Sequence, residues 1–345
     1  MVETTTRMAD ELREGPRAVQ NQAKALSTPL RDLIARLKAR PPQLVVTCAR
    51  GSSAHAATFG KHLIERHLGI PVAAMAPNIA TVYRQALRLS GQLFLTISQS
   101  GRSDDLIEGA MMAKNAGALT AALVNASDSP LAAACDIVLP MSAGPERSVA
   151  ATKTFIASLA ALLRLVALWS DNDGALPALD RLPDRLAEAT ALEWSAAASA
   201  FAAASSLIAI GRGPTLAIAR EAALKLKEIA NLHAEAFSGA EFLHGPVALV
   251  STRYPILMFT PNDAAADGLR RLAGDLAAKG AALFIADSGT NGISGNHLPM
   301  LAPDDPEADA LCQIQSFYAM MVSLAERLGI DPDRPRHLRK VTRTR

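Results

Sequence analysis

Cysteine is scarce in this 345-residue chain, and the three that are present, Cys48, Cys135 and Cys312, lie far apart. An odd number of cysteines without a C-x-x-C pair predicts neither a disulfide framework nor a metal site built on cysteine. Unpaired thiols fit a reducing compartment, so we expect a cytoplasmic protein.

Aromatic residues make up only 4% of the sequence, and the formal net charge is only +2. Few aromatic rings disfavour a surface that stacks single-stranded nucleic acid, and a nearly balanced charge gives no electrostatic reason to expect DNA, RNA or an anionic membrane as partner. No apolar run is long enough to cross a bilayer, and the polar amino terminus lacks the apolar segment of a signal peptide. We therefore expect neither a nucleic acid nor a membrane partner.

Several enzyme motifs are also missing. His55, His62 and His67 are not accompanied by a carboxylate in the H-E-x-x-H arrangement, so we assign them no metal. The G-x-S-x-G elbow of serine hydrolases and the G-x-x-x-x-G-K-[ST] nucleotide loop are absent as well. We expect no metal and no other cofactor.

Short apolar runs that alternate with helical windows dominate the rest of the chain. With 50% hydrophobic residues, 345 residues are enough for about two domains. We expect a helical segment over 8–37, with Pro16 and Pro29 as breaks or helix starts, and a helical window that follows Gly51-Ser52-Ser53 and ends at about Leu68. The predicted strands are 44–48, 93–97, 119–124 and 137–139. This alternation is typical of an α/β fold with a parallel sheet.

The second half repeats this layout. Leu44 corresponds to Leu207, and Leu93 to Ile256, with further matches for the later strands at a nearly constant offset. We therefore expect an internal duplication that gives two tandem α/β domains, each a parallel sheet flanked by helices. The predicted boundaries are a helical segment at 1–40, a first domain at 41–170, a linker at 171–195, a second domain at 196–330 and a tail at 331–345.

A serine-rich loop follows the second predicted strand and reads Ser98-Gln99-Ser100-Gly101-Arg102-Ser103. Hydroxyls and free backbone N–H groups at the start of a helix favour an anion, and phosphate is the natural ligand. The alternative is an ordinary cluster of helix-capping serines. Gly51-Ser52-Ser53 after the first strand is a weaker signal, and it lies beside this loop if the two strands are neighbours.

The most distinctive stretch runs from Gly211 to Pro246. The apolar run 207–210 before it is predicted to form a strand, and the stretch itself continues with a tight loop and a long helix. Glu221, Lys225 and Glu228 share one helical face, and an apolar stripe that ends at His233 forms another. On spacing alone, the charged face also fits a solvated Glu–Lys pair that contributes a few tenths of a kcal/mol. His244 follows in a predicted turn.

A third segment, Glu146-Arg147-Ser148-Val149-Ala150-Ala151-Thr152-Lys153, contains a possible helix start. We expect Ser148 to cap a helix that continues to about Trp169.

Taken in order, these segments resemble the sugar isomerase (SIS) family, and most closely the isomerase half of glucosamine-6-phosphate synthase and the stand-alone SIS-type deaminases. The matching motifs span nearly the whole chain beyond residue 40: GSS at 51–53, ISQSGRSDD at 97–105, ERSVAATKTF at 146–155, EAALKLKEIANLHAEAFSGAEFLHGP at 221–246 and DRPRHLRKVT at 333–342. The resemblance implies two tandem SIS domains.

The resemblance also implies roles for individual residues. Glu228 would move a proton between C1 and C2 of an open-chain sugar, with Lys225 and Glu221 beside it. His244 would assist ring opening from the neighbouring subunit of a homodimer, and Lys340 on the tail would complete the pocket. The remaining contacts would come from Ser53, Ser98, Gln99, Ser100 and Ser103 to the phosphate and from Ser52 and the backbone at Val149 to the sugar.

The leading hypothesis is an enzyme that converts glucosamine 6-phosphate to fructose 6-phosphate and ammonia. The chain enters the first SIS segment almost directly, without the glutaminase domain of the synthase, so glutamine is not expected as nitrogen source. Alternatives are a galactosamine 6-phosphate deaminase, a fructosamine 6-phosphate deglycase, ammonia-dependent glucosamine 6-phosphate synthesis, or a phosphosugar sensor without catalysis.

Overall fold

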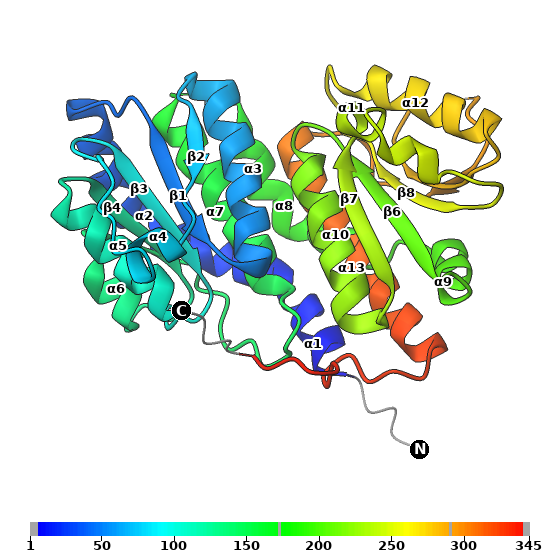
Figure 1. Ribbon diagram of the computed structural model, residues 1–345, viewed down its shortest axis with the longest axis horizontal. Helices are drawn as coiled ribbons and strands as arrows, with labels where there is room; N and C mark the ends of the chain where they lie inside the picture. Colours follow the sequence, from blue (N-terminus) through cyan, green and yellow to red (C-terminus); the bar gives the residue numbers. More distant parts are fainter. Residues whose placement is uncertain (1–5, 172–173, 290–291, 341–345) are drawn as a thin grey trace. The chain divides into compact units, whose positions relative to one another are not determined.

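The computed structural model describes residues 6–171, 174–289 and 292–340. They form two compact units whose sequences interleave. The first unit contains Arg17–Glu146, Lys153–Asp180 and the end of the tail from Arg339, and the second contains the chain up to Pro16, Arg147–Thr152 and Arg181–Leu338. Each unit is a parallel sheet with helices on its faces (Figure 1).

The first unit has a five-stranded sheet in the order β2-β1-β3-β4-β5, and all of its pairings are parallel. Its strands are β1 (Val45–Ala49), β2 (Val72–Ala74), β3 (Leu93–Ser98), β4 (Leu119–Val124) and β5 (Ile137–Pro140). Its helices are α2 (Gly15–Ala39), α3 (Gly51–Leu68), α4 (Asn78–Thr81), α5 (Asp104–Asn115), α6 (Pro130–Ala134) and α7 (Lys153–Trp169).

The second unit has a five-stranded parallel sheet in the order β10-β9-β8-β6-β7. Its strands are β6 (Ser206–Gly211), β7 (His233–Ser238), β8 (Pro255–Phe259), β9 (Ala282–Ala286) and β10 (Asn296–Leu298). Its helices are α1 (Arg7–Arg13), α9 (Ser195–Ala202), α10 (Thr215–Ala230), α11 (Gly239–Phe242), η1 (Pro246–Leu249), α12 (Ala266–Ala278) and α13 (Pro306–Arg327). Helix α8 (Ala175–Thr190) lies in the segment expected as a linker and carries the chain from the first unit into the second.

The duplication expected from the sequence is confirmed by the strand register. Val45 of β1 pairs with Leu93 of β3, and Ile208 of β6 pairs with Ile256 of β8, so both members of the pair are displaced by 163 residues. The two strand orders are also the same once each strand is matched to its counterpart. The helices show the same duplication, because α3 packs on α7 in the first unit and α10 packs on α13 in the second.

Two strands are not predicted from apolar runs in the sequence. Strand β2 has only three residues, and β7 contains no continuous apolar run. The prediction that His233 continues the apolar stripe of the long helix is wrong. Helix α10 ends at Ala230, where Asn231 adopts a left-handed backbone with φ 51°, and His233 is the exposed first residue of β7. Asparagine tolerates this conformation better than most residues and so ends the helix.

Proline 29 does not break or start a helix, contrary to expectation, because it lies inside α2. An interior proline removes one backbone hydrogen bond and costs about 3 kcal/mol. Leu26, Leu30 and Leu33 on the same helix are fully buried. Burial of such side chains contributes roughly 1.5–3 kcal/mol each, which is enough to keep the helix continuous.

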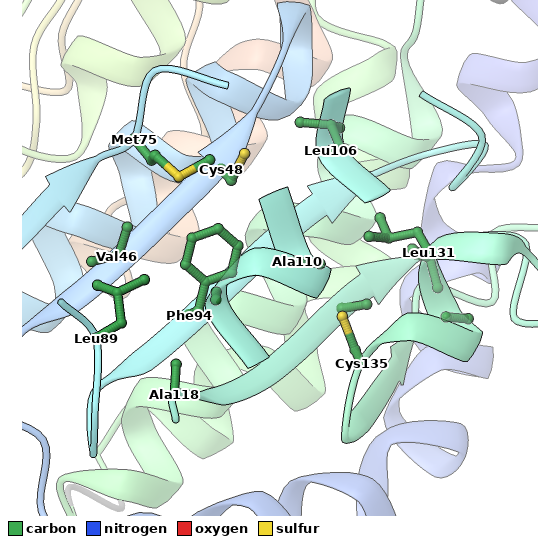
Figure 2. Packing of buried hydrophobic residues seen from close by; sticks show 14 residues of the cluster. Val46, Cys48, Met75, Leu89, Phe94, Leu106, Ala110, Ala118, Leu131 and Cys135 are labelled. Atoms are coloured by element: carbon green, nitrogen blue, oxygen red, sulfur yellow. The ribbon is translucent and has the colours of Figure 1, made fainter. Parts of the chain in front are cut away.

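One hydrophobic cluster of the first unit lies between its sheet and α5. Figure 2 shows Phe94 of β3 among Val46 and Leu89, with Ala110 of α5 beside it. Small residues on α5 let the helix approach closely, and a side chain added at Gly109 would come within 2.9 Å of the Met75 methyl group. The second unit has a matching core between its sheet and α12. No helix in the described part of the chain is both long and apolar enough to cross a membrane.

Candidate active site

The two serine-rich segments lie at the same edge of the first sheet. Strand β1 pairs in parallel with β3, and Ala49 stands opposite Ile97 at their carboxyl ends. Helix α3 begins with Gly51-Ser52-Ser53 directly after β1, and the Ser98–Ser103 loop joins β3 to α5. The prediction that these segments are neighbours is confirmed by this pairing, and the carboxyl edge of a parallel sheet is where ligands bind in such folds.

Internal hydrogen bonds fix the shape of the Ser98–Ser103 loop. The Ser98 hydroxyl accepts a bond from the Gly101 N–H at 3.1 Å, and the Ser100 hydroxyl accepts one from the Arg102 N–H at 3.4 Å. Gly101 has φ 61°, and a Cβ there would lie 2.0 Å from the Ser129 hydroxyl oxygen. Only glycine fits, so the close turn depends on this residue.

Other polar side chains in these segments are left available. In the ranges that the structure describes, the side chains of Ser53, Gln99 and Ser103 form no hydrogen bond, and each is partly exposed. Ser103 is the N-cap residue of α5 yet makes no side-chain capping bond. Serines that only cap a helix would bond its first N–H groups. The loop therefore favours ligand binding over simple capping.

Arg50 ties the two segments together. Its guanidinium donates to the Asp105 carboxylate at 3.0 and 2.8 Å, and the Asp105 side chain is fully buried. Arg50 precedes α3, and Asp105 lies in the first turn of α5. The pair fixes one helix start relative to the other.

The second unit carries the expected charged face on α10. The Lys225 ammonium lies 3.2 Å from the Glu221 carboxylate and 2.6 Å from the Glu228 carboxylate. The side chains of Glu221 and Lys225 are 0% and 1% exposed, so this is not a solvated surface pair. Glu228 is 21% exposed, and in the described chain its second oxygen, Oε1, forms no hydrogen bond.

The charge balance around Lys225 is clear. Burial alone lowers the pKa of this lysine, but the carboxylates of Glu221 and Glu228 outweigh burial and raise the pKa above its usual value. Lys225 is therefore a fixed cation that holds Glu228 in place through Oε2.

Tyr318 of α13 completes this group and was not identified from the sequence. Its hydroxyl lies 3.2 Å from Glu221 Oε1, and the side chain is fully buried. A tyrosine about 100 residues downstream in a long helix gives no spacing signal, so only packing between α10 and α13 brings it to Glu221.

His244 lies in the turn after α11, as expected, and its side chain is exposed. In the part of the chain that the structure describes, it makes no hydrogen bond or ion pair with Glu221, Lys225 or Glu228. Within one chain, therefore, the structure groups the three α10 residues and leaves His244 outside that group.

The Glu146–Lys153 segment differs from the prediction. Helix α7 begins at Lys153, so Ser148 does not cap it. The buried Glu146 carboxylate takes that role, because it accepts the Thr154 N–H at 3.1 Å and the Thr154 hydroxyl at 2.6 Å. Lys340 of the tail lies 3.1 Å from the same carboxylate.

Comparison with known proteins adds a family assignment. The sequence profile described as SIS domain matches residues 41–168 and 200–325, one segment over each sheet. The isomerizing glutamine–fructose-6-phosphate aminotransferase of Caulobacter vibrioides is 34% identical over 316 residues, which cover 86% of this chain and 51% of that protein. The chain thus spans about half the length of this relative.

Two solved structures are similar over nearly the whole chain. A presumed phosphosugar isomerase from Silicibacter pomeroyi DSS-3 is 42% identical, with a TM-score of 0.90 over 95% of this chain and 100% of the other. The C-terminal domain of glucosamine-fructose-6-phosphate aminotransferase from Francisella tularensis is 25% identical, with a TM-score of 0.85 over 96% and 99%.

Proposed function

The chain belongs to the SIS domain family of phosphosugar isomerases, and from that premise we propose that it converts glucosamine 6-phosphate to fructose 6-phosphate and ammonia. The observation that carries the proposal is the Glu221–Lys225–Glu228 group on α10, in which Glu221 and Lys225 are buried and Glu228 Oε1 forms no hydrogen bond within the described residues. An aldose–ketose conversion moves a proton between C1 and C2, and it needs one group that acts first as base and then as acid.

We assign the phosphate of the substrate to the serine loops. The side chains of Ser53, Gln99 and Ser103, which form no hydrogen bond within the described residues, offer donors. Ser98 and Ser100 keep their hydroxyl protons while accepting backbone N–H groups. The starts of α3 and α5 add the positive ends of their helix dipoles. Ser52 and the backbone at Val149 are assigned to the sugar.

Glu228 is assigned the proton transfer. Lys225 holds one of its oxygens at 2.6 Å, which leaves the other to take the C2 proton and return it at C1. Glu221 in turn holds Lys225 from the buried side, and the Tyr318 hydroxyl donates to Glu221. His244, which is exposed in the single chain, is assigned to ring opening in a neighbouring subunit of a homodimer. Lys340 is assigned to complete the pocket near the carbon atoms C1 and C2 of the substrate.

The direction of the reaction follows from solution chemistry. After the proton moves, C2 carries an imine, and water attacks an imine without a further substrate. The reverse reaction needs free ammonia, which is mostly protonated near neutral pH and then is no nucleophile. We therefore propose net release of ammonia without dependence on glutamine.

The experiment is to incubate the purified protein with glucosamine, galactosamine and fructosamine 6-phosphates and to measure ammonia and the ketose product. Release from glucosamine 6-phosphate at the highest kcat/KM supports the proposal. Release from another member of the panel alone would reassign the substrate. Tight binding without turnover of any of them would indicate a phosphosugar sensor and would refute an enzymatic role.

A further inference from the structure

A hydrogen-bonded cluster links residues near both ends of the chain to residues 147–148 in its middle. Glu11 on α1 is 6% exposed, and its carboxylate accepts the N–H groups of Arg147 and Ser148, the latter at 3.1 Å. Asp333 of the tail accepts the Ser148 hydroxyl at 3.2 Å. We call Glu11, Asp333 and the residues they bind at 147–148 the Glu11–Asp333 cluster.

Asp333 also holds the first turn of α1. Its two carboxylate oxygens accept the N–H groups of Arg7 at 2.7 Å and Met8 at 3.0 Å, and the Thr6 hydroxyl accepts the next free donor, from Ala9. A carboxylate at a helix start satisfies unpaired donors and interacts favourably with the positive dipole end. The tail therefore caps α1, and α1 in turn carries Glu11.

The position of this cluster gives it a functional meaning. Arg147 and Ser148 directly precede Val149, whose backbone is assigned to the sugar, and the tail beyond Asp333 leads to Lys340. From these contacts we infer that Glu11 and Asp333 are positioning residues for the proton-transfer reaction. They fix the position of the backbone at 147–149 and of the tail at Asp333. This inference rests on the proposed function.

The expected effect follows from the hydrogen bonds. Glutamine at position 11 keeps the size of the side chain but replaces one acceptor oxygen with an NH₂ group, which then faces backbone donors. A displacement of reacting groups by about 1 Å can lower turnover on the order of 10²-fold. Because the serine loops that bind phosphate are untouched, kcat should fall while KM stays within about twofold.

The test compares Glu11→Gln and Asp333→Asn with Asp10→Asn. Asp10 lies on the same helix and undergoes the same charge change, but its side chain is 55% exposed and pairs with Arg13 on the surface. Steady-state kinetics are measured for each variant together with thermal stability. We expect a fall in kcat of roughly 10- to 100-fold for the two cluster variants and wild-type kinetics for Asp10→Asn.

A milder variant covers the case in which Glu11→Gln fails to fold. Ser148→Ala deletes only the hydroxyl that donates to Asp333, and the tail carboxylate keeps its bonds to α1. For Ser148→Ala we expect a smaller fall in kcat than for Glu11→Gln, with unchanged KM. Wild-type kcat in all folded cluster variants, or losses that only follow the folded fraction, would overturn the inference.

Hydrogen exchange separates this inference from the proposed function. In Glu11→Gln, peptides that cover 146–149 and 333–338 should exchange faster, while peptides from α10 should not change. If the wild-type protein proved inactive on every hexosamine phosphate, the proposed function would be refuted. Unchanged exchange at 146–149 in Glu11→Gln would separately refute the inference that Glu11 fixes this backbone.

Discussion

Replacing Lys225 with methionine tests whether the charged group on α10 is a buried, interdependent unit. Methionine retains the length and most of the volume of lysine but removes the cation that lies 3.2 Å from Glu221 and 2.6 Å from Glu228. Glu221 is 0% exposed, so its carboxylate would lose that cation where water cannot replace it. Removing one partner of a buried ion pair costs about 3–5 kcal/mol.

The matched control is Lys227→Met on the same helix. Lys227 is exposed and donates to the Ala234 carbonyl oxygen at 2.9 Å, so its loss should cost no more than about 1 kcal/mol. Equilibrium unfolding in urea gives the free energy of unfolding for both variants. We expect a deficit for Lys225→Met at least twice that of the control.

The dependence on pH provides a second check on the same variant. An isolated buried carboxylate relieves part of its cost by taking up a proton, so the deficit of Lys225→Met should be smaller at about pH 5 than at about pH 8. A deficit below about 1 kcal/mol at both pH values would refute the view that this group is buried and charged.

Three further predictions concern the phosphate loop, the tail and the thiols. Ser98→Ala with Ser100→Ala should raise KM for a phosphosugar by the equivalent of about 1.5–3 kcal/mol per lost bond while the fold survives; an unchanged KM would exclude this loop as the phosphate site. Lys340→Ala should lower turnover, and wild-type rates in that variant would end its assignment. Burial raises the pKa of the Cys48 and Cys312 thiols to about 12, so they should resist alkylation in the folded protein. Because the unfolded chain releases these protons near pH 9.0 and the folded chain does not, the free energy of unfolding should fall as the pH rises above 9.0; equal stability at pH 8 and pH 10 would contradict this.

The sequence predicts most of the sheet framework, because the strands that are buried on both faces are continuous apolar runs. Leu119–Val124 has the predicted bounds, and the 163-residue repeat reappears in the strand register. Strand β7 was missed since its sequence, HAEAFS, contains no continuous apolar run, so that only pairing with β6 defines it. The interior Pro29 was misjudged because local propensity gave way to burial along α2.

The site was predictable to a similar degree. Glu221, Lys225 and Glu228 share a face because helical spacing dictates it, and the serine loops are neighbours because their strands are adjacent in a parallel sheet. The contacts of Glu11 and Asp333 could not be predicted, since each residue binds groups more than 100 positions away. The role of Glu146 at the start of α7 was missed because Ser148 is the more common type of capping residue.

An isotope experiment tests whether Glu228 carries the proton between C1 and C2. The wild-type protein, Glu228→Gln and a control, Glu235→Gln, whose carboxylate is exposed on β7, are each incubated with glucosamine 6-phosphate in D₂O. Ammonia and deuterium at C1 of the ketose are measured together. We predict deuterium at C1 alongside ammonia for the wild type and the control. For Glu228→Gln we predict a loss of turnover of roughly 10²- to 10⁴-fold with phosphosugar binding retained. Full activity in Glu228→Gln would contradict it.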